Sequence, residues 1–218
     1  MFFHPPSTGG TSVEFSLTTA IADIQGGRKN RFKRLYVLTA IAAGRYGKHK
    51  IPDEIKKLDP DVWDSYFKFM FVRNPWDRFV SFFHRRMVEE ESTVKDFSEF
   101  VHSDQFWLLK PQTIWFHKDL NFIGRFESLH EDFLRVCRKV GVNTNRLSHI
   151  RTGKPRQLPH YSCYYNEETK GIIADVYRED IDMFGYEFSE SYEPPITGLH
   201  LVYDSDGFAC GFDNLMML

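Results

Sequence analysis

The sequence predicts an α/β domain with a mainly parallel central sheet. Two segments rich in aromatic and β-branched residues, Tyr66–Val72 and the stretch around Ile123, are predicted to be buried strands. Each precedes a segment with apolar residues at helical spacing. Alternating strands and helices favour a parallel sheet, because parallel strands need long crossover connections. With 42% hydrophobic residues, the 218-residue chain can bury a sizeable core.

At the N-terminus, "MFF" at 1–3 is expected to be the end of a short strand. A helix is predicted from Thr11 to about Ile24, where "QGG" ends it. The basic stretch "RKNRFKR" at 28–34 is either a solvated loop or a rim that attracts anions. The stretch "IPDEIKKLDPDVW" predicts one short charged helix closed by Asp59-Pro60.

Three further helices are expected after Val72. One has Pro75 in its first turn, a second is ended by Gly141, and a third runs from about Glu167 to Phe184. From Ser189 onward, prolines, glycines and "YDSDGF" predict a hairpin-rich appendage. The expected division is therefore a nucleotide-binding domain at 1–188 and an appendage at 189–218.

Composition excludes several classes of protein. The net charge of −2 excludes a globally basic nucleic-acid binder, so no nucleic-acid partner is expected. Three cysteines without a CxxC pair predict neither a zinc site nor a disulfide framework, and they favour a reducing compartment. The longest apolar run is too short to span a bilayer, and no signal peptide is recognisable. A soluble, cytoplasmic protein is expected; a Golgi-luminal location would require a trimmed N-terminal anchor.

The first loop, "HPPSTGGTS" at His4–Ser12, is one candidate anion site. It leads into a predicted helix, whose N-terminus exposes N–H groups and partial positive charge. Its glycines permit close backbone approach, and its hydroxyls can donate hydrogen bonds. The same residues also suit a simple helix cap, and the loop lacks the lysine of the Walker pattern.

The second candidate anion site is "VRNPWDRFVSFFHRR". Arg73 follows a predicted strand, so it should stand at the carboxyl end, where open α/β sheets bind ligands. Ser81 lies two helical turns later and can converge with Arg73 on one anion. The alternative is that the arginines of this stretch are surface charges: Arg73, Arg78, Arg85 and Arg86.

Taken in order, four segments resemble sulfotransferases, closest to the carbohydrate-sulfotransferase-like branch (sulfotransferase family 2). They are "HPPSTGGTSV", "FKFMFVRNPWDRFVSFF", "IGRFESLHEDF" and "YYNEETKGIIADVYREDIDMFGYEF". The resemblance runs from about Phe3 to Phe188. It implies a P-loop-like three-layer domain and 3′-phosphoadenosine 5′-phosphosulfate (PAPS) as co-substrate, with no metal. The implied partner is a small-molecule or glycan acceptor that receives sulfate on a hydroxyl or an amine, most plausibly of a sugar.

The resemblance also implies where the nucleotide binds. Arg73 and Ser81 would hold its 3′-phosphate. Lys154 and Arg156 resemble a late basic loop near the nucleotide, although a solvated loop is an equal alternative. The residues implied for the 5′ phosphate are Ser7, Thr8, Gly9, Gly10, Thr11 and Ser12.

Sulfuryl transfer from PAPS requires a base for the acceptor proton and stabilisation of the leaving bisphosphate. By resemblance His49 is the preferred base, and the adjacent Lys48 and Lys50 favour its neutral form. Glu14 on the first helix is the second choice. His4 is expected to shape the end of the first strand.

Ser7 departs from the family pattern, which has a lysine there. Losing one donor to a developing charge costs about a hundredfold or more in rate. A neutral hydrogen bond from Ser7 would give a slower enzyme, or a basic residue such as Lys48 or Arg28 would fill the gap. The remaining alternative is a homologue that binds PAPS, its bisphosphate product or a polyanion without turnover. A kinase is disfavoured, because the Walker lysine is missing and "RNPWDRFVS" would go unexplained. Neither the acceptor nor the oligomeric state can be read from the sequence.

Overall fold

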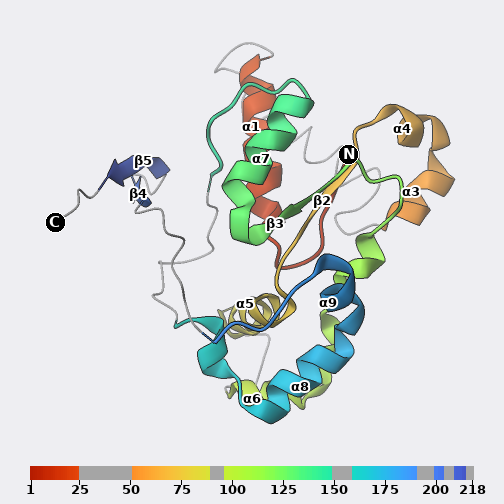
Figure 1. The fold of residues 1–218 in the computed structure, drawn as a ribbon. Helices are drawn as coiled ribbons and strands as arrows, with labels where there is room; N and C mark the ends of the chain where they lie inside the picture. The colour runs from red at the N-terminus through yellow and green to blue at the C-terminus, as the bar shows by residue number, and fades with distance from the viewer. Residues whose placement is uncertain (25–50, 89–95, 149–158, 191–198, 204–208, 215–218) are drawn as a thin grey trace.

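The computed structural model describes residues 1–24, 51–88, 96–148, 159–190, 199–203 and 209–214 (Figure 1). In chain order, the strands and α-helices are β1 (Phe2–Phe3), α1 (Gly10–Ile24), α3 (Pro52–Leu58), α4 (Pro60–Ser65), β2 (Phe69–Val72), α5 (Pro75–Val88), α6 (Phe97–Val101), β3 (Phe122–Arg125), α7 (Leu129–Lys139), α8 (Glu167–Val176), α9 (Arg178–Phe184), β4 (Leu199–Tyr203) and β5 (Ala209–Asn214). Short 3₁₀ helices are η2 (Asp104–Leu108), η3 (Gln112–Trp115), η4 (Phe126–Ser128) and η5 (Tyr161–Tyr164).

The first three strands form a parallel sheet in the order β1-β2-β3. Phe3 of β1 pairs with Met70 of β2, which pairs in turn with Ile123 of β3. All four residues of β2 are buried, as expected for a central parallel strand that is covered on both faces.

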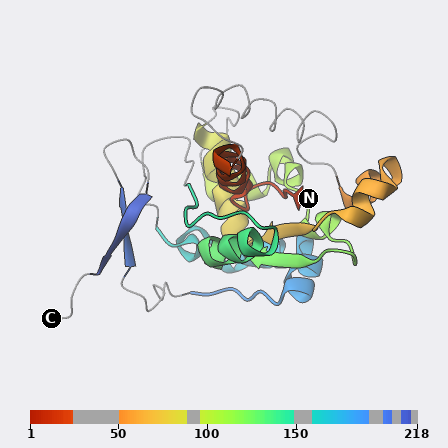
Figure 2. The ribbon, with the colours of Figure 1, turned by 90° about the horizontal axis from the view of Figure 1, so that it is seen from above.

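Helices cover the two faces of this sheet (Figures 1 and 2). Phe69 and Phe71 of β2 belong to a buried cluster with α1 and α7. Met70 and Val72, which point the other way, pack with residues of α3, α4 and η3 and with Phe184 at the end of α9. The predicted α/β class, with helices flanking a parallel sheet, is therefore confirmed.

A third buried cluster lies beyond the carboxyl ends of the strands (Figure 1). It is built on α5, whose Phe79 and Phe83 pack against Phe100 of α6. Ile173 of α8 belongs to the same cluster and is fully buried. This helical layer anchors α5, the helix that follows the central strand.

Two predicted helix boundaries are confirmed in atomic detail. Asn74 precedes Pro75, and its Oδ1 accepts a hydrogen bond from the backbone N–H of Trp76 at 3.1 Å, so it caps α5. At the end of α7, Gly141 has a φ of +73°. The N–H of Val142 donates to the carbonyl of Cys137 at 2.9 Å, as in a Schellman motif.

Three predicted elements differ in extent. The strand begins at Phe69 and not at Tyr66, which is exposed at the end of α4. Asp59-Pro60 closes α3 but also opens α4, because Asp59 accepts from the N–H of Val62 and proline suits a first helical position. The helix predicted from Glu167 to Phe184 is interrupted at Tyr177, whose buried hydroxyl donates to the carbonyl of Leu109 at 2.7 Å.

The C-terminal strands β4 and β5 pair antiparallel, with Leu199 opposite Asn214. The residues after Ser189 thus contain a hairpin, while the division near residue 188 stays a prediction. In the described part of the chain, none of the helices has the length and apolar character needed to cross a bilayer.

Candidate functional site

The carboxyl ends of the three parallel strands bring distant segments together. His4 follows β1, Arg73 follows β2, and Phe126 follows β3. Because the strands are parallel, these ends meet at one edge of the sheet. The predicted position of Arg73, at the end of a strand, is therefore confirmed.

The first loop turns sharply before α1. Ser7 and Gly9 both have left-handed backbones, with φ of +63° and +77°. Thr8 is fully buried and its hydroxyl donates to the carbonyl of Pro5 at 2.8 Å. The carbonyl of Gly9 accepts from the N–H groups of Ser12 and Val13. The loop thus delivers Gly10 to the N-terminus of a 15-residue helix, where the first N–H groups have no intrahelical acceptor.

Both glycines of the first loop lie against other residues. A Cβ on Gly9 would stand 2.7 Å from Cδ2 of Leu129, and one on Gly10 would stand 1.9 Å from Cδ2 of His4. His4 is itself buried and stacks on Phe2, so the ring has little room to move. The expectation that His4 shapes the end of the first strand agrees with this packing.

Gly10→Ala is expected to destabilise the fold by about 1–3 kcal/mol, the usual cost of overpacking. Gly171→Ala is a matched control, because a Cβ there meets nothing within 4 Å. That change, in α8, should stabilise by about 0.5–1 kcal/mol. Thermal unfolding of both variants checks the prediction, and equal stability of the two would contradict it.

Of the two candidates for the base, Glu14 lies among the residues that the structure describes, whereas His49 does not. It lies on α1, about one-third exposed, with its Oε1 3.4 Å from Nδ1 of His4. This pair places a carboxylate and an imidazole at the start of the helix that follows the first loop.

The Arg73 guanidinium joins the two predicted anion sites. Its Nη1 donates to the carbonyl of Ser7 at 3.3 Å, and it lies over the Phe126 ring, 3.9 Å from the centroid. Its Nε and Nη2 donate to both carboxylate oxygens of Asp77, at 2.8 and 2.9 Å. The forked contact predicted for an external anion is thus made to Asp77.

Ser81 lies one turn after Asp77 on α5, so the two side chains share a helix face. Among the described contacts, none joins Ser81 to Arg73 directly. An anion held by both residues would therefore have to share Arg73 with the carboxylate of Asp77.

The backbone around Arg73 is held from two sides. The side-chain amide of Gln112 accepts from the N–H of Arg73 at 2.8 Å and donates to its carbonyl at 2.9 Å. The next N–H, of Asn74, donates to Glu127 at 2.7 Å. Glu127 also accepts a hydrogen bond from the hydroxyl of Tyr186. Burial raises the pKa of Tyr186 well above its ordinary value. These contacts fix the strand end before any ligand binds.

Arg78 is the site residue that sequence reasoning missed. As a surface charge it would be solvated, but it is 0% exposed. Its Nε donates to the carbonyl of Pro6 at 2.9 Å, and its Nη2 donates to the carbonyl of Lys110 at 3.0 Å. Burial lowers the pKa of Arg78 to about 10, which leaves it charged at neutral pH. The alternative that the arginines of this stretch are surface charges is therefore wrong for Arg78, whereas Arg85 is exposed.

The charge partner of Arg78 is Asp180, which is also 0% exposed. Asp180 Oδ2 lies 3.8 Å from Nη1 of Arg78, an ion pair without a hydrogen bond. Asp180 also accepts from the N–H groups of Gln112 and Thr113, at 2.8 and 2.9 Å. One buried network thus links the first loop, α5, η3 and α9.

Asp180→Ala should lower the free energy of unfolding by about 3–5 kcal/mol, because it leaves the buried Arg78 uncompensated. Asp182→Ala, at an exposed position of the same helix, should change it by no more than about 0.5 kcal/mol. Urea-induced unfolding measures both, and a small effect at Asp180 would show that the pair contributes little.

Four predicted site residues fall outside the described part of the chain: His49, Lys48, Lys154 and Arg156. Arg28, named as a replacement for the missing lysine, also falls there. Thr11, by contrast, is described and is exposed in the first turn of α1.

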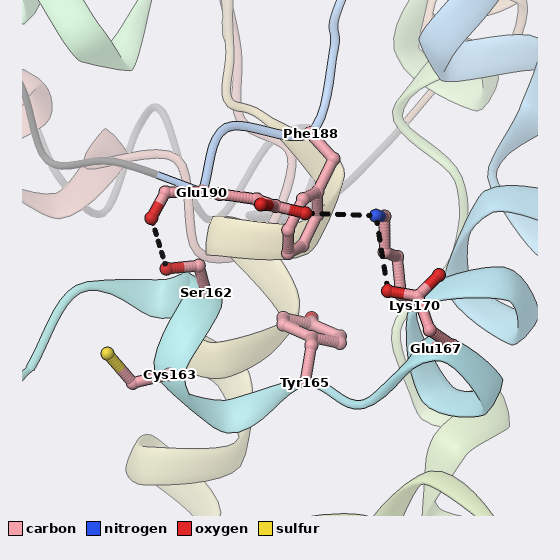
Figure 3. Close-up of a pocket in the computed structure, with 7 residues that line it drawn as sticks. All are labelled: Ser162, Cys163, Tyr165, Glu167, Lys170, Phe188 and Glu190. Atoms are coloured by element: carbon pink, nitrogen blue, oxygen red, sulfur yellow. Dashed lines mark hydrogen bonds and ion pairs between the residues drawn. The ribbon is translucent and has the colours of Figure 1, made fainter.

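An open cavity of about 320 Å³ lies elsewhere on the molecule (Figure 3). The predicted site residues take no part in its lining. Lys170 at its edge lies 3.6 Å from both Glu167 and Glu190 and covers the ring of Phe188. The charged side chains that line the cavity pair with one another, and the predicted sulfuryl transfer does not involve this cavity.

Comparisons with known proteins agree with the predicted family. The model of the sulfotransferase family matches residues 39–187, which include Arg73 and Ser81 and begin after the first loop. An uncharacterized protein of Archaeoglobus fulgidus is 31% identical over 96 residues, covering 39% of this chain and 77% of that protein. No solved structure matches the chain. With the family model matching most of its length, the chain belongs to the sulfotransferase family.

Proposed function

We propose that this protein transfers a sulfuryl group from PAPS to a hydroxyl group, or an amine, of a carbohydrate acceptor. One contact carries the proposal: the hydrogen bond from Arg73 Nη1 to the Ser7 carbonyl, which joins segments 66 residues apart. Two motifs suited to anions lie together at the carboxyl edge of a parallel sheet. A nucleotide with separate 3′ and 5′ phosphates has the matching charge distribution.

In this proposal the first loop and the N-terminus of α1 hold the 5′ phosphate. Backbone N–H groups and partial positive charge at a helix N-terminus stabilise an anion there. Arg73 and Ser81 hold the 3′-phosphate. Gln112 and Glu127 keep the backbone at Arg73 and Asn74 in place through the hydrogen bonds described above.

The chemical step forms a bond between the acceptor oxygen and sulfur. The bond from sulfur to the bridging oxygen of the 5′ phosphate breaks, and that oxygen keeps the electron pair. The acceptor proton passes to a base, for which Glu14 and His49 are the candidates. The donors of the first loop stabilise the charge that develops on the leaving bisphosphate.

Titration calorimetry with adenosine 3′,5′-bisphosphate, AMP and ATP tests the proposal. We expect the bisphosphate to bind more tightly than either nucleotide that lacks a 3′-phosphate. Equal affinities for the three would overturn the proposal.

The second candidate function is a homologue that binds the nucleotide without turnover, which the serine at position 7 favours. It predicts the same binding preference but no transfer of labelled sulfate from PAPS to any member of a broad glycan panel. Transfer to one glycan would exclude it.

A further inference from the structure

Lys110 lies beside the first loop. Arg78 holds the carbonyl of Pro6 with Nε and the carbonyl of Lys110 with Nη2, at 2.9 and 3.0 Å. These two nitrogens belong to one planar guanidinium, so the backbone at Lys110 is a close neighbour of the backbone at Pro6 and Ser7. The guanidinium is fully buried and its Asp180 partner is held by η3, which fixes this arrangement.

The charge of Lys110 is available to a ligand. Its side chain is exposed, and no ion pair or hydrogen bond of its ammonium is found among the residues that the structure describes. Among the described residues, the arginines near the first loop are already compensated, Arg73 by Asp77 and Arg78 by Asp180. Lys110 thus offers a cation that no described residue compensates, next to a loop whose own position 7 is neutral.

We infer that Lys110 supplies the positive charge for the 5′ phosphate that Ser7 does not supply. This inference rests on the proposed function, because it concerns the same nucleotide. Lysine has a flexible four-carbon stem and three N–H donors, so its ammonium can reach an anion on the first loop from a neighbouring segment. It would bind the 5′ phosphate and stabilise the bridging oxygen as that oxygen takes the electron pair.

Binding measurements test this role without requiring turnover. Adenosine 3′,5′-bisphosphate and adenosine 3′-monophosphate differ only in the 5′ phosphate. Lys110→Ala should raise the Kd of the bisphosphate about tenfold, the effect of one charge-assisted hydrogen bond. It should change the Kd of the 3′-monophosphate by less than about twofold. Lys110→Arg should keep most of the affinity for the bisphosphate.

Lys118→Ala is the matched control. Lys118 is also exposed, but it precedes β3 and so lies toward the amino edge of the sheet, away from the first loop. The control removes the same charge and should leave both Kd values unchanged.

The outcomes separate the two proposals. Equal losses for both ligands, or equal effects of Lys110→Ala and Lys118→Ala, would overturn the role of Lys110 and leave the proposed function standing. If the unmodified protein shows no preference for the bisphosphate over AMP, the proposed function fails and this inference fails with it.

Discussion

Arg73→Ala should remove most of the preference for adenosine 3′,5′-bisphosphate over AMP. Arg73 can form a forked, charge-assisted contact, and it already makes one of this geometry with Asp77. A hydrogen bond to a charged group contributes about 1.5–3 kcal/mol. The loss of the charge-assisted hydrogen bonds that Arg73, shared with Asp77, would give the 3′-phosphate should therefore weaken bisphosphate binding about a hundredfold, while AMP binding changes little.

The fold should survive this change. The Arg73 side chain lies over Phe126 and does not belong to any of the three buried clusters, and its backbone is held by Gln112. Arg85→Ala is the control, since Arg85 lies on α5, the helix that begins two residues after Arg73, is exposed and lies over the ring of Phe82. Calorimetry with both nucleotides decides the matter. A parallel loss for bisphosphate and AMP would mean that Arg73 does not recognise the 3′-phosphate.

The sheet and its flanking helices could be predicted because their signals are local. Pro75 opens α5 and Gly141 closes α7, as their backbone preferences require. The four-residue apolar run from Phe69 to Val72 matches a central strand that is buried on both faces. Such signals depend on one residue and its chain neighbours, so they remain readable in a single sequence.

The buried network could not be predicted, because its partners are distant in the chain. Arg78 is held by Pro6, Lys110 and Asp180, and no local pattern connects these positions. One signal was present: Arg78 lies four residues before Phe82, which places it on an apolar face of α5. An arginine on such a face needs a buried partner, but the sequence does not identify Asp180 as that partner.

The helix break at Tyr177 has a similar cause. The segment from Glu167 to Phe184 has a continuous helical pattern, yet Tyr177 ends α8 and its hydroxyl bonds to the carbonyl of Leu109. That acceptor lies 68 residues earlier in the chain. Tertiary contacts therefore override the local preference at this position.

Ser7→Lys is expected to raise the turnover of sulfuryl transfer by about a hundredfold, the usual effect of one donor to a developing charge. The new ammonium would lie on the first loop, next to the proposed site of the 5′ phosphate. Position 7 has a left-handed backbone, with φ of +63°. This conformation costs a lysine and a methionine a similar conformational free energy. Ser7→Met is therefore the control, because it has a long side chain in the same conformation without the charge.

Labelled sulfate transfer from PAPS measures the gain. If lysine and methionine at position 7 give the same rate, the missing charge does not limit catalysis. If Ser7→Lys creates activity where the unmodified protein has none, the remaining site is intact. The unmodified protein then binds the nucleotide without turnover.

Combining Ser7→Lys with Lys110→Ala extends the same prediction. If both lysines act on the 5′ phosphate, Lys110→Ala should slow the unmodified protein about tenfold and the Ser7→Lys variant much less, because neighbouring groups with a shared role are not additive. Equal losses in the two backgrounds would mean that the two positions act independently. The coupling between positions 7 and 110 thus measures how far a lysine on a neighbouring segment replaces one on the loop itself.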